Sequence, residues 1–276
     1  MSKSNRTVII TGATSGIGLG LAQAFLRDGF NVVGTGRSDA RLAQTAAVLD
    51  AGERFLPVAG DVADPAAATA AFAKAIEAYG HVDVLINNAG IFAAKPFVDF
   101  TPDEIETQIA TNLKGTLYFS QAAARHMSGR GSGRIVNVTA SLAMQANSGV
   151  PALLAAVLKG GMNQATKALA LELAPFGVTV NAVAPGVVNT PMHAPETHDA
   201  LGKMHPLGRI AEVEDIAQAV RYLVENDYVT GTILPVDGGY AAGRAVSKVK
   251  GVRYAIRQHP HHAGRQYRRA KGSGHS

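Results

Sequence analysis

The stretch TGATSGIG, residues 11–18, decides how the rest of the chain is interpreted. An apolar run at residues 7–10 precedes it and predicts a buried strand, and the apolar periodicity of residues 19–27 predicts a helix directly after it. The glycines let the backbone turn tightly and approach a ligand without interference from a Cβ atom. Because the free N–H groups and the positive dipole end of the helix face whatever lies against the turn, this arrangement favours a pyrophosphate.

The glycine spacing alone is a weak signal, because a tight loop between a strand and a helix can need the same residues and bind nothing. The spacing G-x-x-x-G-x-G also differs from the G-x-G-x-x-G fingerprint of dinucleotide-binding proteins, although the strand–turn–helix context is the same. The turn therefore predicts a phosphate-binding site only together with the features that follow.

The composition is that of a globular protein. Of the 276 residues, 47% are hydrophobic and 17% are charged, which is enough for a substantial core and excludes wholesale disorder. No apolar run approaches the roughly 18–20 residues of a membrane span, and the polar first residues lack the apolar region of a signal peptide. The absence of cysteine excludes disulfides, thiolate nucleophiles and thiolate metal sites. A cytoplasmic protein fits these features best.

The positive charge belongs to one end of the chain. Residues 246–276 contain eight Lys or Arg and no Asp or Glu, so residues 1–245 carry 18 basic and 21 acidic side chains. We therefore expect one domain at 1–245 and a basic, disordered tail at 246–276. Contact of the tail with nucleic acid is not favoured, because no recognisable binding fold accompanies it.

Apolar runs alternate with helical patterns along the chain. The predicted strands are 8–10, 32–35, 55–58, 84–86, 135–138, 178–183 and 233–236, and the predicted helices are 17–28, 39–51, 65–79, 102–128, 153–175 and 212–225. Strands that are apolar on both faces and separated by helices indicate a parallel sheet covered on both sides. The fold class is therefore α/β, a Rossmann-like doubly wound parallel sheet of about seven strands. The segments after residue 138 and at 186–211 follow strands, so both should lie over the carboxyl edge where such folds bind ligands.

Over residues 6–243 the chain resembles the short-chain dehydrogenase/reductase family. The motifs that carry the resemblance are 11–18, Asp61-Val62, 87–90 (NNAG), Asn112, 134–138, Lys159-Gly160, Pro185-Gly186 and 237–239 (DGG). The resemblance implies a nicotinamide dinucleotide site and hydride transfer between the cofactor and an alcohol or carbonyl. The residues implied to bind the cofactor are Gly12, Thr14, Ser15, Gly16, Ile17, Gly18, Asp61, Val62, Asn88, Ala89, Gly90, Lys159, Pro185, Gly186, Val188 and Thr190.

The end of the second predicted strand favours NADP(H) over NAD(H). A site that prefers NAD places a carboxylate there to hold the ribose 2′-hydroxyl, whereas this chain has Gly36 followed by Arg37. A guanidinium at this place suits a 2′-phosphate. Asp39 is expected to cap the next helix instead. The alternative is that Arg37 is a solvated loop cation.

The residues of proton transfer depart from the resembled family. That family uses a tyrosine four residues before the lysine, which places both on one face of a helix. Here Ala155 precedes Lys159, and no tyrosine occurs between Tyr118 and Tyr222. A methyl group transfers no proton, and general acid–base catalysis contributes on the order of 10²–10⁴ in rate.

Two further catalytic positions follow from the resemblance. The family's serine aligns with Ala140, and Ser141 is displaced by one residue, so whether Ser141 serves is open. Asn112 holds a water in the family's proton relay, and its alternative role is that of a kink residue inside a helix.

Three hypotheses fit a site of this kind. The first is an active oxidoreductase whose proton donor is Lys159 or a group of the loop after the sixth strand, which contains His193, Glu196, His198 and His205. The second is a catalytically weak NADP(H)-binding sensor or partner subunit. The third is a metal-dependent activity that uses residues 193, 196 and 198, but their spacing matches no recognised ligand motif, so we expect no metal. We favour the first, with Asn112, Ser141, Lys159 and His193 as the catalytic residues.

The predicted helix 153–175 is rich in apolar and small residues. A wholly buried helix would explain the pattern. The resemblance implies instead that this helix pairs across a two-fold axis in a homodimer or homotetramer. The substrate is expected to be a small molecule that the loop 189–211 selects.

Overall fold

The structure is a computed structural model that describes residues 6–147 and 149–243. The predicted basic tail at 246–276 lies outside the described residues. Within the described part of the chain, no helix is both long and apolar enough to cross a membrane.

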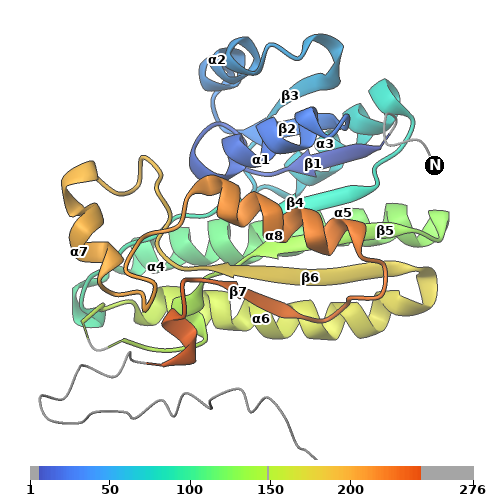
Figure 1. The fold of residues 1–276 in the computed structure, drawn as a ribbon. Helices are drawn as coiled ribbons and strands as arrows, with labels where there is room; N and C mark the ends of the chain where they lie inside the picture. The colour runs from blue at the N-terminus through green and yellow to red at the C-terminus, as the bar shows by residue number, and fades with distance from the viewer. Residues whose placement is uncertain (1–5, 148, 244–276) are drawn as a thin grey trace, which may run out of the picture. The chain divides into compact units, whose positions relative to one another are not determined.

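A single parallel sheet of seven strands organises the described chain (Figure 1). The strand order is β3-β2-β1-β4-β5-β6-β7, and every neighbouring pair is parallel. The strands are β1 (Thr7–Ile10), β2 (Asn31–Gly36), β3 (Phe55–Ala59), β4 (Val84–Asn87), β5 (Gly133–Val138), β6 (Val178–Pro185) and β7 (Ile233–Val236). Because the chain first builds outward from β1 to β3 and then continues on the other side of β1 from β4, the order reverses between β1 and β4. A crevice for ligands is expected at that reversal.

Helices cover both faces of the sheet, as predicted. They are α1 (Gly16–Arg27), α2 (Asp39–Leu49), α3 (Pro65–Tyr79), α4 (Pro102–Gln108), α5 (Gly115–Arg130), α6 (Leu153–Leu173), α7 (His198–Gly202) and α8 (Val213–Glu225). One apolar core joins α1 and α8 to the sheet, and a second core joins α3, α5 and α6 to the opposite face. Along β1, Val8 and Ile10 belong to the first core and Ile9 to the second, which is the alternation expected of a strand buried on both faces. The predicted fold class is confirmed.

The predicted helix 102–128 is interrupted. A π-helical segment, Ile109–Lys114, lies between α4 and α5. Single π-turns widen a helix and occur often at functional sites. Asn112 lies in this segment and is buried. The irregular segment thus includes Asn112, the residue of this helix that the sequence singles out.

The cap of α2 differs from the expectation. Ser38 is the N-cap residue, and its hydroxyl accepts a hydrogen bond from the backbone N–H of Arg41. Asp39 is the first residue of the helix, where its carboxylate favours the positive dipole end. The prediction that Asp39 caps the helix is therefore wrong by one residue.

The interpretation of α6 as wholly buried is also wrong. Leu153, Val157 and Leu171 are 52%, 60% and 79% exposed. No described atom lies within 4 Å of the place that a Cβ would take at Gly160 or Gly161. The outer face of α6 thus carries exposed apolar side chains at both ends, and no described residue covers it at Gly160 and Gly161.

Candidate active site

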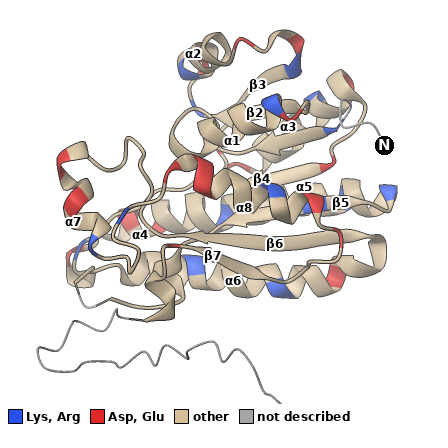
Figure 2. Ribbon diagram, in the orientation of Figure 1, with Lys and Arg blue, Asp and Glu red and all other residues tan. Residues whose placement is uncertain are grey.

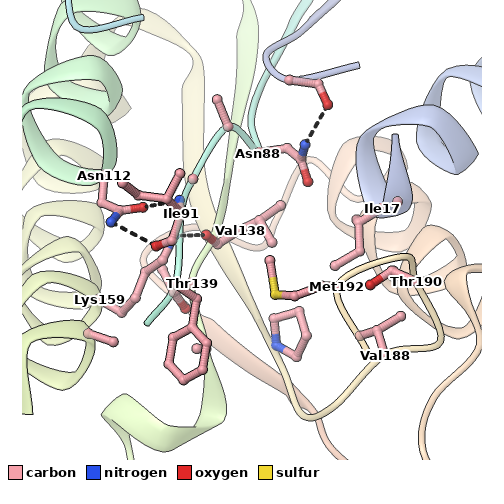
Figure 3. Close-up of a pocket in the computed structure, with 18 of the residues that line it drawn as sticks. Ile17, Asn88, Ile91, Asn112, Val138, Thr139, Lys159, Val188, Thr190 and Met192 are labelled. Carbon is pink, nitrogen blue, oxygen red and sulfur yellow. Dashed lines mark hydrogen bonds between the residues drawn. The ribbon is translucent and has the colours of Figure 1, made fainter. Parts of the chain in front are cut away.

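A cavity of about 1060 Å³ lies over the carboxyl ends of the strands (Figure 3). Its walls come from the glycine turn after β1, the loops after β2, β4, β5 and β6, and the first half of α6. Every residue that the sequence favours for cofactor binding or catalysis lines this cavity, except Gly18, whereas the alternative proton donors Glu196 and His198 do not line it. The candidate residues, which are spread over 180 positions of sequence, therefore share one space.

Gly18 lies beneath the turn, not at its surface. A Cβ at this position would be 2.2 Å from the carbonyl oxygen of Gly12 and 2.5 Å from Nδ2 of Asn88. Only glycine therefore lets α1 approach the turn this closely. Its role is in packing the turn on the helix.

The glycine turn is attached to β4 by side chains. Asn88 Nδ2 donates to the carbonyl oxygens of Thr11 and Gly12, at 2.9 and 3.2 Å, and Figure 3 draws one of these two bonds. The Thr11 hydroxyl oxygen accepts from the N–H groups of Asn88 and Ala89, both at 3.0 Å. Gly12 has φ +67°, in the left-handed region that favours glycine. These bonds hold the turn open across the β1–β4 reversal, and sequence reasoning missed Thr11 because its partners lie more than 70 residues away.

The N-terminus of α1 presents free donors to the cavity. Ser15 is the N-cap residue and makes no capping hydrogen bond through its side chain. Within the described residues, the N–H groups of Gly16, Ile17 and Gly18 have no hydrogen-bond partner. A helix start of this kind, open to a cavity, fits a phosphate group.

The end of β2 forms a basic corner, which we define as Gly36, Arg37, Ser38 and Arg41. All four line the cavity, and Asp39 does not. A Cβ at Gly36 would lie 2.9 Å from Cγ2 of Thr14, so the close approach of the glycine turn excludes a side chain here. Neither arginine of this corner forms an ion pair within the described chain.

Arg41 is a residue that the sequence analysis missed. Its position in the sequence could have indicated it, because a residue three positions after the Ser38 cap lies in the first turn of α2, beside Arg37. On the opposite wall, Asp61 is the only acidic lining side chain among the described residues, and it accepts a hydrogen bond from the N–H of Ala63 at 3.0 Å.

The side chains of Lys159 and Asn112 both lie close to Gly90. A Cβ at Gly90 would lie 2.8 Å from Asn112 Oδ1 and 3.5 Å from Lys159 Nζ. The lysine Nζ donates to the carbonyl oxygen of Val138 at 2.9 Å (Figure 3). Burial disfavours the charged form and lowers the pKa of Lys159 to about 8. An ammonium in this state can give up a proton near neutral pH.

Both amide atoms of Asn112 are used by the backbone of Ile91. Its Oδ1 accepts from the N–H of Ile91 and its Nδ2 donates to the carbonyl oxygen of Ile91, both at 3.0 Å (Figure 3). Nδ2 also donates to Oε1 of Gln108 at 3.2 Å. The π-helical turn thereby fixes the loop after β4, which forms one wall of the cavity.

Ala155 and Ser141 complete this part of the cavity. Ala155 lies one helical turn before Lys159 on α6, and its methyl group faces the cavity. Ser141 begins the 3-10 helix Ser141–Ala143 and is 3% exposed, and its neighbour Ala140 also lines the cavity. Ser141 thus reaches the same space as Lys159 despite its displaced sequence position.

The histidines of the loop after β6 separate into two kinds. His193 lines the cavity, and burial, assisted by the nearby His198, lowers the pKa of its imidazole. His205 is buried, with Nδ1 2.7 Å from the carbonyl oxygen of Asp237 and Nε2 accepting from the N–H of Val187. Since backbone groups occupy both of its ring nitrogens, His205 is a structural residue and not a free proton donor.

Glu196 and His198 do not line the cavity. His198 contacts the carbonyl oxygen of His193 through Nε2, at 3.2 Å. Across residues 6–147 and 149–243, no group of three or more His, Cys, Asp or Glu side chains is arranged to hold a metal ion.

Comparison with known proteins identifies the family. The family profile described as enoyl-(acyl carrier protein) reductase matches residues 12–241. The short-chain reductase NovJ of Streptomyces niveus is 39% identical over 245 residues, which cover 84% of this chain and 92% of NovJ. The structure of ElxO with NADP bound has a TM-score of 0.82 at 28% identity, covering 87% of this chain and 100% of ElxO.

A second solved structure, 3-ketoacyl-(acyl-carrier-protein) reductase from Brucella melitensis complexed with NADH, has a TM-score of 0.81 at 31% identity. It covers 87% of this chain and 100% of that enzyme. The seven-stranded sheet, the cavity over its carboxyl edge and these similarities agree: the chain belongs to the short-chain dehydrogenase/reductase family.

Proposed function

We propose that the protein is an NADP(H)-dependent oxidoreductase that transfers a hydride between the nicotinamide and a carbonyl, alcohol or imine substrate. The proton is exchanged with a side chain other than tyrosine. The observation that carries this proposal is that one cavity joins the glycine turn and the basic corner to Lys159 and His193.

The residues present fit a dinucleotide. The free N–H groups at the start of α1 suit the pyrophosphate, and the glycine turn leaves no Cβ in the way. Asp61 and Val62 suit the adenine end, and Pro185, Gly186, Val188 and Thr190 suit the nicotinamide end. When bound, the dinucleotide supplies or accepts the hydride.

The basic corner supports NADP(H) as the favoured form. Two guanidinium groups and the Ser38 hydroxyl face the cavity, and the carboxylate of Asp39 does not. Charge-assisted hydrogen bonds from arginine suit a phosphate, whereas a ribose 2′-hydroxyl needs an acceptor such as a carboxylate. The solved relatives named above carry NADP in one case and NADH in the other, so this preference rests on the chain's own residues.

Lys159 acts as the general acid and His193 as the general base, because their charge states at neutral pH differ. With a pKa of about 8, Lys159 is mostly protonated at pH 7 and serves as the acid for reduction of a carbonyl. His193, whose pKa is lowered by burial, is mostly neutral at pH 7 and serves as the base for oxidation of an alcohol. Ser141 orients the substrate oxygen, and Asn112 holds the wall that carries Ile91.

Ala155 favours a second hypothesis, that the protein is a weakly catalytic NADP(H)-binding sensor or partner subunit. Its methyl group occupies the position where the resembled family has its proton donor. The exposed apolar side chains on the outer face of α6, Val157 among them, support a homodimer or homotetramer in either case. The cytoplasmic location stays a prediction.

The test begins with the binding of NADPH and NADH, which is measured as a change in the fluorescence of the cofactor. Oxidation of NADPH is then measured with a panel of ketones, aldehydes, diketones and imines. We expect tighter binding of NADPH and measurable turnover, with Lys159→Ala reducing carbonyl reduction more than His193→Ala does. Tight binding with no turnover for any substrate, unchanged in Ala155→Tyr, would identify the sensor instead.

A further inference from the structure

We propose that the part of the cavity beyond Lys159 takes a neutral, apolar carbonyl compound, and not a carboxylate, a phosphate ester or an acyl thioester of an acidic carrier. The inference rests on the proposed oxidoreductase function and adds the class of substrate. We call this part the substrate end and define its walls as Phe92, Leu142, Val150, Ala155, Met192 and Leu201.

The walls of the substrate end are apolar on every side. They come from three loops and one helix: the loop after β4, the loop after β5, the start of α6 and the segment after β6. Burial of apolar surface in such a space favours a ligand by about 25 cal/mol per Å². Met192, which is 60% exposed, is flexible and polarizable and can adapt to ligands of different shape.

The substrate end has no side chain suited to an anionic substituent. The polar side chains that we assign to this end are Ser141, Lys159 and His193, and the arginines among the described lining residues, Arg37 and Arg41, belong to the basic corner. The Lys159 ammonium already donates to the Val138 carbonyl. The proposed function directs the proton of Lys159 to the reacting oxygen of the substrate. A carboxylate elsewhere on the substrate would therefore be buried without a partner of its own, which is costly.

The surroundings of the entrance repel anions. The loop containing Phe92 leads into α4, and residues 91–108 carry four acidic side chains and one basic side chain. Lys95 is paired with Glu104 at 2.7 Å, and Glu106 is paired with Lys114, which leaves Asp99 and Asp103 as acidic side chains without an ion pair among the described residues. Leu201 lies on α7, and residues 195–204 carry two acidic side chains and one basic side chain. Figure 2 shows acidic residues on both α4 and α7. An acidic carrier protein or a nucleotide-bearing thioester therefore meets like charge at this entrance.

Ala155 adds room where the substrate end meets Lys159. A methyl group at this position leaves space for a ring directly above the helix turn that carries the ammonium. A cyclic or branched ketone fills this space better than a linear one. We therefore expect ring-shaped neutral ketones to be the best members of the class.

The test compares substrates that differ only in charge or apolar size. With NADPH, kcat/KM is measured for cyclohexanone, its 4-methyl and 4-ethyl derivatives, 4-oxocyclohexanecarboxylate and acetoacetyl-coenzyme A. We expect kcat/KM to rise up to about fourfold for each added carbon that is buried. The carboxylate should fall at least about tenfold below the 4-methyl ketone, which corresponds to 1.4 kcal/mol. Equal or better use of the carboxylate or of the thioester would overturn the proposal.

Two methionine variants localise the effect. Met192→Lys should improve the carboxylate relative to the 4-methyl ketone by about tenfold, because it adds a cation at the wall of the substrate end. Met144→Lys is the matched control. Met144 is 43% exposed and comes two residues after Leu142, but it does not line the cavity. An equal change in both variants would mean that general surface charge is responsible and would contradict the assignment of the substrate end.

A binding measurement separates failure of the substrate class from failure of the proposed function. The NADP⁺-loaded full chain is titrated with 4-ethylcyclohexanone and with the carboxylate, and heat of binding is recorded. Selective binding of the neutral ketone without turnover supports the substrate class and counts against oxidoreductase activity. Turnover with preference for the carboxylate supports the activity and overturns the substrate class.

Discussion

The two ends of the cavity are built in different ways. At the glycine turn, backbone groups are held by hydrogen bonds such as those between Asn88 and the carbonyls of Thr11 and Gly12, and two arginines line the basic corner beside it. At the substrate end, the walls that we define are apolar, and Lys159, His193 and Ser141 are the side chains to which we assign contact with the reacting group. The first end depends on backbone geometry and the second on a few side chains.

This difference teaches that recognition of a dinucleotide and transfer of a proton are separate properties of the chain. A backbone cradle tolerates little change, since a single added Cβ at Gly18 would overlap the turn. A proton-transfer position on a helix face can change from one residue to another while the helix still packs. We interpret Ala155 as such a position, and α6 keeps Leu154 and Leu158 buried on either side of it.

The largest expected effect comes from Gly18→Ala. The new methyl group would lie 2.2 Å from the Gly12 carbonyl oxygen, so the turn must shift and NADPH binding should weaken by more than about 100-fold. Gly129→Ala is the matched control, because no described atom lies near that position of α5 and alanine favours a helix. Fluorescence titration with NADPH, with thermal melts of both variants, checks the prediction. Unchanged affinity in Gly18→Ala would break the proposed role of the turn.

The next effect concerns the choice of dinucleotide. Replacing Arg37 and Arg41 together by alanine should weaken NADPH binding by about 10- to 100-fold, because each charge-assisted hydrogen bond contributes about 1.5–3 kcal/mol. NADH binding should change by less than about threefold. The ratio of the two dissociation constants is the measurement. Parallel weakening of both dinucleotides would show that the basic corner does not contact a 2′-phosphate.

A smaller effect is expected on stability. Burial lowers the pKa of Lys159 to about 8, whereas the pKa of a lysine in the unfolded chain is about 10.4. The buried ammonium therefore lowers the free energy of unfolding below pH 8, and this destabilisation disappears as the pH rises from 8 toward about 10.4. Lys159→Met should therefore raise the free energy of unfolding at pH 7 by on the order of 2 kcal/mol. This advantage should shrink above pH 8 and vanish near pH 10.5.

Chemical denaturation of the cofactor-free wild type and Lys159→Met at pH 7 and pH 10 checks that prediction. Lys167→Met, on the exposed side of α6, is the control for loss of a surface charge. If the advantage of Lys159→Met were the same at both pH values, the ammonium would not be the source of the penalty.

The sequence predicted the sheet well, and the residues that it proposes for cofactor binding, apart from Gly18, line one cavity. Strands that are apolar on both faces have few alternatives to a parallel sheet, and the carboxyl edge then collects the turn, the loop after β4 and the end of β6. The residues of the binding end act largely through backbone atoms. Their positions therefore follow from topology and from glycine placement, as Gly12 and Gly36 illustrate.

Features that depend on contacts between distant segments were not predictable. The π-helical turn at Asn112 coincides with its bonds to Ile91, and His205 became structural because Asp237 lies against its ring. The side chains of Ser38 and Asp39 are both suited to an N-cap, and in the structure Ser38 occupies that position. No periodicity or spacing reports such pairings.

The most direct test of the separation between binding and proton transfer is the turnover of Ala155→Tyr. NADPH oxidation with acetone, a neutral ketone too small to need the space above Ala155, is measured at saturating cofactor, together with the dissociation constant of NADPH, and Ala155→Phe provides the same ring without the hydroxyl. We predict that Ala155→Tyr raises kcat by about 100-fold, that Ala155→Phe does not, and that NADPH affinity stays within about twofold in both. An unchanged kcat in a folded, NADPH-binding Ala155→Tyr variant would contradict the account.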